Sequence, residues 1–284
     1  MKNKLKHLVP VLLALATITG SLSACELKPK AQQKVSKQGF YFDTIIQITL
    51  YGTTDEKYID DCFDMAKKYE DMLSNTVSYS EVSKINDAAG KEYVTVSDET
   101  LELIKKGIEY GDTSDGRFDI TIGKLSDLWN FSEIAENTDS KDNEVDASVV
   151  PSDAQIQSEL SHVNYRNIQI NGNDVMLTDS KAKLDLGGIA KGFIADKMKA
   201  YLQSKKITSG IINLGGNVLT VGKKSDGSDY TVGIQKPFDE SGEPICTVKV
   251  KDKSVVTSGI YERYYRVDGK LYHHILAASY THLR

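Results

Sequence analysis

The chain has 284 residues, of which 40% are hydrophobic and 26% charged; this composition excludes both a disordered chain and a multispan membrane protein. The formal net charge is −5, and no dense run of lysine and arginine offers a surface for nucleic-acid phosphates. Three cysteines are too few for a disulfide scaffold, and none forms a CxxC pair typical of zinc sites. We therefore expect a mildly acidic globular protein with a sizeable core.

Residues 1–24 have the pattern of a secretory signal peptide: a basic start, an apolar run over residues 8–18, and then small residues. The run is too short for an ordinary membrane-spanning helix. The signal ends in Leu-Ser-Ala before Cys25, which resembles the lipobox of bacterial lipoproteins, in which the cysteine is lipid-modified. The sequence thus predicts an exported protein held to the cell membrane through Cys25, with residues 25–38 as a tether. A plain signal peptide is the alternative.

Two further cysteines remain after export, Cys62 in a helical pattern and Cys246 in a strand pattern. An oxidising compartment would permit a disulfide between them, but the sequence does not show whether they lie close together. We expect both to be buried.

The first half of the chain is predicted to be mainly helical. A strand of alternating polarity covers residues 42–51, and apolar spacings of three and four predict amphipathic helices. These helices are expected over residues 55–73, 80–86 and 98–113. Ser97 is the expected N-cap of the third, with Thr100 in its first turn.

The second half is predicted to be rich in strands. The acidic segment 132–148 is expected to be a loop, and a helix follows Pro151. A hairpin is expected around residues 171–173, and a strand over residues 182–187 leads into a helix that ends near residue 205. The remaining strands are predicted over residues 211–221, 230–235, 245–251, 254–258 and 261–267. This order favours an α+β fold, with a helix-rich N-terminal half packed on a largely antiparallel sheet.

The strongest chemical signal is Asp-Leu-Gly-Gly-Ile-Ala-Lys-Gly over residues 185–192, where a strand is expected to turn into a helix. Backbone N–H groups of such a turn can approach an anion, and the helix dipole and Lys191 add positive charge. It is not a Walker A loop. Taken alone, a glycine turn of this kind is more often structural than phosphate-binding.

Four other segments carry candidate residues. In residues 115–123, Asp119 and Thr121 point to one face if the segment is extended, although a hairpin with one exposed carboxylate is the simpler interpretation. The glycine pair in residues 213–217 is most simply a bulged strand. Residues 257–264 and the histidine pair before residue 275 complete the set, and at most one of two adjacent strand histidines is expected in a given site.

In this order, the segments resemble the FAD:protein FMN transferase family, ApbE, from about residue 40 to residue 276. The matching stretches are DGRFDITIGKLSDLW, DLGGIAKGFIAD, NLGGN, TSGIYERYY and YHHI. Five motifs in the family's order and spacing make the resemblance very specific. It implies an ApbE-like, T-fold-like architecture over residues 39–276.

The resemblance also implies a function. Family members use FAD and Mg²⁺ and transfer FMN to a Thr or Ser hydroxyl of an exported flavoprotein, such as a subunit of a membrane redox pump, and they release AMP. It implies FAD contacts at Phe42, Arg117, Phe118, Asp119, Asp185 and Lys191. It further implies a metal contact through the carbonyl of Gly188, and a proton-accepting role for His274.

The chain departs from the family pattern after residue 276. Residues 277–284 do not match, and the family's later Asp and Thr metal ligands are not found, so we expect impaired transferase turnover. Two alternatives to FMN transfer follow from the same FAD contacts: an FAD-storing lipoprotein, and an enzyme that hydrolyses FAD to FMN and AMP. We further expect Asp119, Asp185 and Lys191 to converge on one cleft.

Overall fold

The structure is a computed structural model that describes residues 33–138, 143–239 and 241–278. The chain divides into a unit of residues 1–33 and a unit of residues 34–284, and every element below belongs to the second. The predicted signal peptide and Cys25 lie outside the described residues, so the expected lipid anchor stays a prediction. No helix in the described ranges has the length and apolar character needed to cross a membrane.

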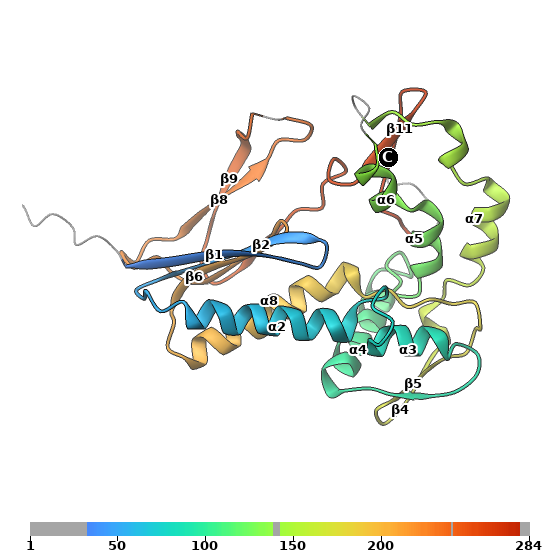
Figure 1. Cartoon of the computed structure of the whole chain (residues 1–284), viewed down its shortest axis with the longest axis horizontal. Coiled ribbons are helices and arrows are strands. Elements are labelled where there is room, and N and C mark those ends of the chain that lie inside the picture. Colours follow the sequence, from blue (N-terminus) through green and yellow to red (C-terminus); the bar gives the residue numbers. More distant parts are fainter. Residues whose placement is uncertain (1–32, 139–142, 240, 279–284) are drawn as a thin grey trace, which may run out of the picture. The chain divides into compact units, whose positions relative to one another are not determined.

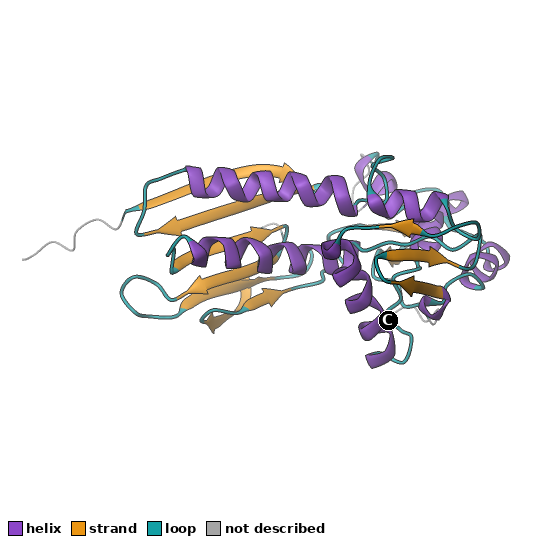
Figure 2. Cartoon of the chain, turned by 90° about the horizontal axis from the view of Figure 1, so that it is seen from below, coloured by secondary structure: helices purple, strands orange, loops and turns teal. Residues whose placement is uncertain are grey.

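Five antiparallel strands form the main sheet, in the spatial order β1-β2-β6-β7-β10. They are β1 (Lys34–Tyr41), β2 (Thr44–Tyr51), β6 (Ser209–Leu214), β7 (Asn217–Gly222) and β10 (Ser254–Val256). Helices α2 (Lys57–Leu73) and α8 (Gly187–Ser204) run side by side across one face of this sheet (Figures 1 and 2). The sheet and the two helices enclose most of the main core.

Helix α2 shows why the sequence forms this layer. Its buried residues follow the spacing of three and four that places them on one face: Ile59, Cys62, Ala66, Tyr69 and Leu73. They belong to the same core cluster as alternate residues of β2, namely Ile46, Ile48 and Leu50. Each large apolar side chain buried in this way contributes roughly 1.5–3 kcal/mol to folding. The predicted strand and helix are therefore confirmed, and they pack on each other.

A second group of elements packs beside the ends of α2 and α8. Helices α3 (Glu81–Asp87) and α4 (Asp98–Thr113) begin at serine N-caps, and the expected Ser97 cap accepts a hydrogen bond from the Thr100 amide. A small sheet has the order β3-β5-β4. Its strands are β3 (Val94–Thr95), β4 (Ile168–Asn171) and β5 (Asp174–Leu177), and β4 and β5 form the predicted hairpin.

A separate aromatic core joins the remaining helices to the C-terminal hairpin. The helices are α5 (Gly123–Trp129), α6 (Phe131–Glu136) and α7 (Asp153–Leu160), and the hairpin strands are β11 (Tyr264–Val267) and β12 (Lys270–His273). Trp129 stacks on Phe131 with ring centroids 5.4 Å apart, and Phe131 stacks on Tyr265 at 5.1 Å. The hairpin that carries His274 is thus anchored to α5 and α6. Strands β8 (Tyr230–Gln235) and β9 (Pro244–Val250) form a further hairpin.

Two expectations about irregular segments are wrong. Residues 34–38, assigned to the tether, are part of β1 and pair with β2. As an edge strand, β1 needs only one well-buried side chain here, Val35, so its polar sequence resembles a linker. The acidic segment 132–148 is not wholly a loop, because residues 131–136 form α6 and residues 147–149 form a 3₁₀ turn. The aromatic core, rather than local propensity, stabilises α6.

Two strand predictions also need correction. Residues 211–221 are not one strand but the hairpin β6–β7, whose turn residues Gly215 and Gly216 both have positive φ. The bulged-strand interpretation of residues 213–217 is therefore wrong. Residues 182–187 form no strand of a sheet; they make one isolated parallel bridge, between Lys183 and Ile122.

Of the two cysteines that were expected to be buried, one is buried. Cys62 is buried in α2, and burial raises the pKa of its thiol to about 12. Cys246 is exposed on β9, contrary to expectation. Both thiols are free in the structure.

The extended segment 182–186 is held by hydrogen bonds to three residues outside it. The Asn86 side chain donates from Nδ2 to the Leu184 carbonyl at 3.0 Å and accepts from the Leu184 amide through Oδ1 at 2.6 Å. The Asp185 amide donates to the Ile120 carbonyl at 2.7 Å, and the Gly123 amide donates to the Lys183 carbonyl at 2.9 Å. Asn86 thus takes the place of a neighbouring strand and fixes where α8 begins.

Replacing Asn86 with alanine is expected to lower the free energy of unfolding by about 2 kcal/mol, because it leaves two buried backbone groups of Leu184 without their partners. Urea unfolding followed by circular dichroism measures the change. Asp87→Ala, one residue away and exposed, is the control and should stay within about 0.5 kcal/mol of the parent chain. Equal stability of the two variants would show that Asn86 does not hold the segment.

Candidate functional site

The first turn of α8 lies against an aromatic side chain of the segment before α5. Asp185 Oδ1 accepts a hydrogen bond from the Gly187 amide at 2.8 Å, which closes the turn. A Cβ atom added to Gly188 would lie 3.2 Å from a ring carbon of Phe118. The glycine therefore lets the Phe118 ring approach the helix N-terminus, and the structure brings together three of the predicted site residues.

Lys191 brings a positive charge to the same end of α8. Burial lowers the pKa of its ammonium group, and the nearby Arg263 lowers it further, while Glu262 opposes this shift. Neither Lys191 nor Arg263 forms a salt bridge in the described part of the chain, and Glu262 is the carboxylate close enough to Lys191 to act on its pKa. Two cations beside the positive end of a helix dipole repel each other, and a bound anion would relieve that repulsion.

His274 lies next to these cations, and its tautomer can be inferred from its contacts. Its Nδ1 lies 3.2 Å from the Arg263 carbonyl oxygen, which also accepts the His274 amide at 3.1 Å. Because a carbonyl only accepts, Nδ1 carries the proton and Nε2 keeps a lone pair. Burial lowers the pKa of His274, although the hydrogen bond to Arg263 acts against this. The imidazole is therefore neutral at neutral pH and can accept a proton at Nε2.

Phe42 occupies the turn between β1 and β2, not the start of β2 as predicted from the sequence. Phe42 and Asp43 are the two turn residues, with φ of 55° and 53°. Arg263 Nη2 donates to the Asp43 carbonyl at 3.4 Å, so this turn touches the residue that also contacts His274. The structure thereby links four segments: the β1–β2 turn, the start of α8, residues 257–263 and the end of β12.

Asp119 does not join this group with its side chain. Asp119 is 5% exposed, and its carboxylate accepts hydrogen bonds from the amide and hydroxyl of Thr121 and from the Tyr165 amide, at 2.6 to 2.8 Å. The expected convergence of Asp119 with Asp185 and Lys191 on one cleft is therefore wrong, since three donors already occupy this buried carboxylate. Phe118, the preceding residue, faces α8 instead, and the Arg117 side chain is exposed.

Two residues of the site were not singled out from the sequence. Arg263 was noted only as part of a motif, although its contacts join the turn, Lys191 and His274. Asn217 is 7% exposed, and its Oδ1 has no hydrogen-bond partner among the described residues. Its amide nitrogen would lie 3.7 Å from a Cβ on Gly192, so it packs against α8 one residue after Lys191. The Asn-Leu-Gly-Gly-Asn pattern of residues 213–217 was the available signal.

The described residues do not by themselves fit a magnesium site. Over residues 33–138, 143–239 and 241–278, no three His, Cys, Asp or Glu side chains gather as metal ligands. Gly188 offers only its carbonyl, which points along α8 toward the amides of the next turn. Protein sites for Mg²⁺ usually add one or two carboxylates to phosphate and water ligands, so we derive no step through the metal.

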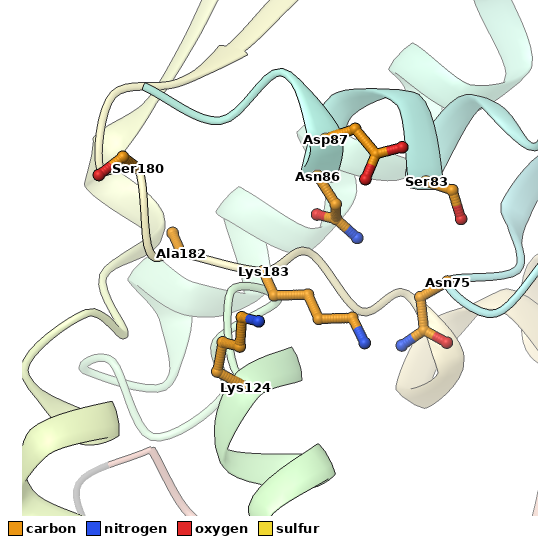
Figure 3. Close-up of a pocket in the computed structure, with 8 residues that line it drawn as sticks. All are labelled: Asn75, Ser83, Asn86, Asp87, Lys124, Ser180, Ala182 and Lys183. Atoms are coloured by element: carbon orange, nitrogen blue, oxygen red, sulfur yellow. The ribbon is translucent and has the colours of Figure 1, made fainter. Parts of the chain in front are cut away.

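A polar hollow of about 300 Å³ lies beside segment 182–186 (Figure 3). Residues of α3, α5 and the loop before segment 182–186 line it, with Asn75. Lys183 and Lys124 give it positive charge, but Asp127 pairs with Lys183 at 2.7 Å. None of the site residues predicted from the sequence lines this hollow.

Comparisons with known proteins agree with the resemblance noted in the sequence. The ApbE family model matches residues 42–280. The chain is 36% identical over 233 residues to the FAD:protein FMN transferase of Klebsiella pneumoniae (strain 342), covering 81% of this chain and 68% of that protein. The crystal structure of the ApbE protein of Thermotoga maritima superposes with a TM-score of 0.77 at 32% identity, over 87% of this chain and 77% of that one.

The flavin transferase ApbE of Vibrio cholerae has the same fold, with a TM-score of 0.72 at 26% identity over 87% of this chain and 77% of that one. The family match runs to residue 280, so the expected break at Ala277 is wrong. Ala277 and Ala278 are buried, and the Ala278 amide donates to the Arg117 carbonyl at 3.0 Å. From its matching family model and its α+β fold, the chain belongs to the ApbE family.

Proposed function

We propose that this protein transfers FMN from FAD to a Thr or Ser hydroxyl of a protein acceptor and releases AMP. The observation that carries the proposal is the positive charge at the start of α8, where Lys191 and Arg263 lie near His274 and form no salt bridge within the described structure, although Glu262 offsets part of their charge. A pyrophosphate supplies the missing negative charge, and the helix N-terminus is suited to receive it.

The chemistry assigns one role to each part of the site. The acceptor hydroxyl oxygen forms a bond to the phosphorus on the FMN side of the pyrophosphate, while the bond from that phosphorus to the AMP oxygen breaks. His274 Nε2 takes the hydroxyl proton, because Nδ1 already donates to Arg263. Lys191, Arg263 and the positive end of the α8 dipole stabilise the negative charge on the phosphates.

The flavin end of FAD is proposed to contact Phe42 in the β1–β2 turn and Phe118 beside Gly188. Asp185 holds the turn that receives the phosphates. When Mg²⁺ is bound with FAD, it would screen phosphate charge, and Gly188 is the family position for a carbonyl contact. Because the described residues do not complete such a site, the proposal assigns the metal no step.

The identity of the acceptor is proposed from the family resemblance, and the location of the protein is proposed from the predicted signal peptide. We propose an exported flavoprotein acceptor, such as a subunit of a membrane redox pump. We also propose that lipid on Cys25 holds the protein to the cell membrane, facing outside the cytoplasm; mass spectrometry of the protein isolated from its membrane would test this modification.

A transfer assay tests the proposed activity. The chain is mixed with FAD, Mg²⁺ and an acceptor flavoprotein domain, and covalent flavin is detected by fluorescence after denaturing electrophoresis, with AMP measured in parallel. We expect a fluorescent acceptor and AMP with the parent chain, and a loss of both of at least about 100-fold in His274→Asn. AMP without labelled acceptor would mean FAD hydrolysis, and FAD binding without either product would mean storage; each contradicts the proposal.

FAD binding should depend on the absence of a side chain at Gly188. Gly188→Val places a branched side chain where Phe118 already approaches to 3.2 Å, so we expect at least about a tenfold loss of FAD affinity, measured by quenching of flavin fluorescence. Gly192→Ala, one turn further along α8, meets only an ordinary contact at 3.7 Å and is the control. Equal affinity in the Gly188 variant and the parent chain would contradict the proposed phosphate site.

His274 should titrate below the ordinary histidine pKa of about 6.5, because burial and its cationic neighbours disfavour the charged ring. The base is active when neutral, so transfer should be retained as the pH falls to 6.5 and should decline at lower pH. In Lys191→Met a nearby cation is removed, and the pKa of His274 should rise. Proton NMR of the ring without FAD measures both values, and His274→Asn assigns the signal. A pKa at or above 6.5 in the parent chain would contradict this environment.

A further inference from the structure

The turn that carries Phe42 has an unfavourable sequence for its shape. Tyr41 pairs with Thr44, so Phe42 and Asp43 form a two-residue hairpin turn. Both residues have φ near +55°, the conformation for which Asn-Gly is the preferred sequence. A bulky residue such as phenylalanine rarely adopts it. Strained backbone of this kind persists only where surrounding groups hold it in place, and it gathers at ligand sites.

Three elements hold this turn. From the last turn of α2, Glu70 Oε1 accepts a hydrogen bond from the Phe42 amide at 2.8 Å. From the other side, Arg263 donates to the Asp43 carbonyl at 3.4 Å. Gly215 in the β6–β7 turn lies so close to Thr44 that an added Cβ would come within 2.4 Å of its hydroxyl oxygen.

Glu70 differs from the other two contacts in its chemistry. Glu70 is half-buried. Among the described residues, its carboxylate accepts a hydrogen bond from the Phe42 amide. A hydrogen bond to a charged acceptor is stronger than one between neutral groups. Removing it would free the amide of a strained residue, whereas the Arg263 contact acts on the carbonyl of the following residue.

We propose that Glu70 is a positioning residue that fixes Phe42 against the flavin by holding the β1–β2 turn in its left-handed conformation. The proposal rests on the proposed function, because it takes Phe42 as a flavin contact. It extends the site to α2, an element with none of the residues expected to bind FAD. Arg263 contacts the Asp43 carbonyl with its side chain and His274 with its own carbonyl, so the turn lies beside the segment that holds the base.

The test uses Glu70→Ala, Glu70→Gln and the double variant Glu70→Ala with Asp43→Gly in the full chain. We expect Glu70→Ala to raise KM for FAD about tenfold or more with a much smaller change in kcat, because His274 and Lys191 remain. Glutamine keeps an acceptor oxygen and should restore most of the affinity. Glycine at position 43 adopts positive φ without a Cβ penalty, so the double variant should also recover.

Asp71→Ala is the matched control. It removes a carboxylate from the next position of α2, where Asp71 binds Lys67 and the Tyr79 hydroxyl instead of the turn. If Glu70 had only a structural role, Glu70→Ala would lower the urea midpoint without changing KM for FAD, as is expected of Asp71→Ala. Unchanged KM in Glu70→Ala, or no recovery in the double variant, would overturn the proposal.

A second readout needs no FAD and separates this proposal from the proposed function. In protein labelled with ¹⁵N-phenylalanine, the Phe42 amide resonance and its coupling to Hα report the hydrogen bond and φ. We expect both to change in Glu70→Ala and to stay near the parent values in Glu70→Gln. If the parent chain neither binds nor transfers FAD, the proposed function fails together with the flavin part of this proposal. Unchanged Phe42 signals in Glu70→Ala would overturn the role of Glu70 itself.

Discussion

The site depends on how a buried, extended segment is held without a sheet around it. Residues 182–186 lead into α8, and their backbone groups pair with Asn86, Ile120 and Gly123 instead of with a strand on each side. A buried backbone group without a hydrogen-bond partner costs free energy. These contacts therefore hold the segment in one position. That position determines where the first turn of α8 points and therefore where Gly188 meets Phe118.

The second constraint is electrostatic. Lys191 sits in the N-terminal part of a long helix, where the dipole disfavours a cation, and Arg263 lies close enough to lower its pKa. An arrangement that is unfavourable in the empty protein becomes favourable when a dianionic pyrophosphate binds. The same cations, together with burial, keep His274 neutral, so one cluster both attracts the substrate and prepares the base.

Local features of the fold were predictable from the sequence, because their causes lie within a few residues. The Ser97 cap, the buried face of α2 and the β4–β5 hairpin follow from neighbouring side chains. Features with distant causes were not predictable. The edge strand β1 depends on pairing with β2, and α6 depends on stacking between Phe131 and Tyr265, 134 positions away in the chain.

The same distinction holds within the site. The motif of residues 185–192 and the importance of His274 could be found from the sequence, because the family resemblance marks them. Which neighbours each residue has could not. Asp119 is engaged by Tyr165, and Arg263 reaches both Asp43 and His274, through contacts between distant parts of the chain. Sequence motifs identified the segments, and only the fold showed which side chains face one another.

A crystal structure of the full chain with FAD is the most direct test of the central claim, that the start of α8 receives the pyrophosphate. We expect the phosphates against the first turn of α8 beside Gly188, with Lys191 and Arg263 in contact and His274 Nε2 facing the phosphorus on the FMN side. Phosphates bound instead in the polar hollow beside Lys124 and Lys183 would contradict the claim.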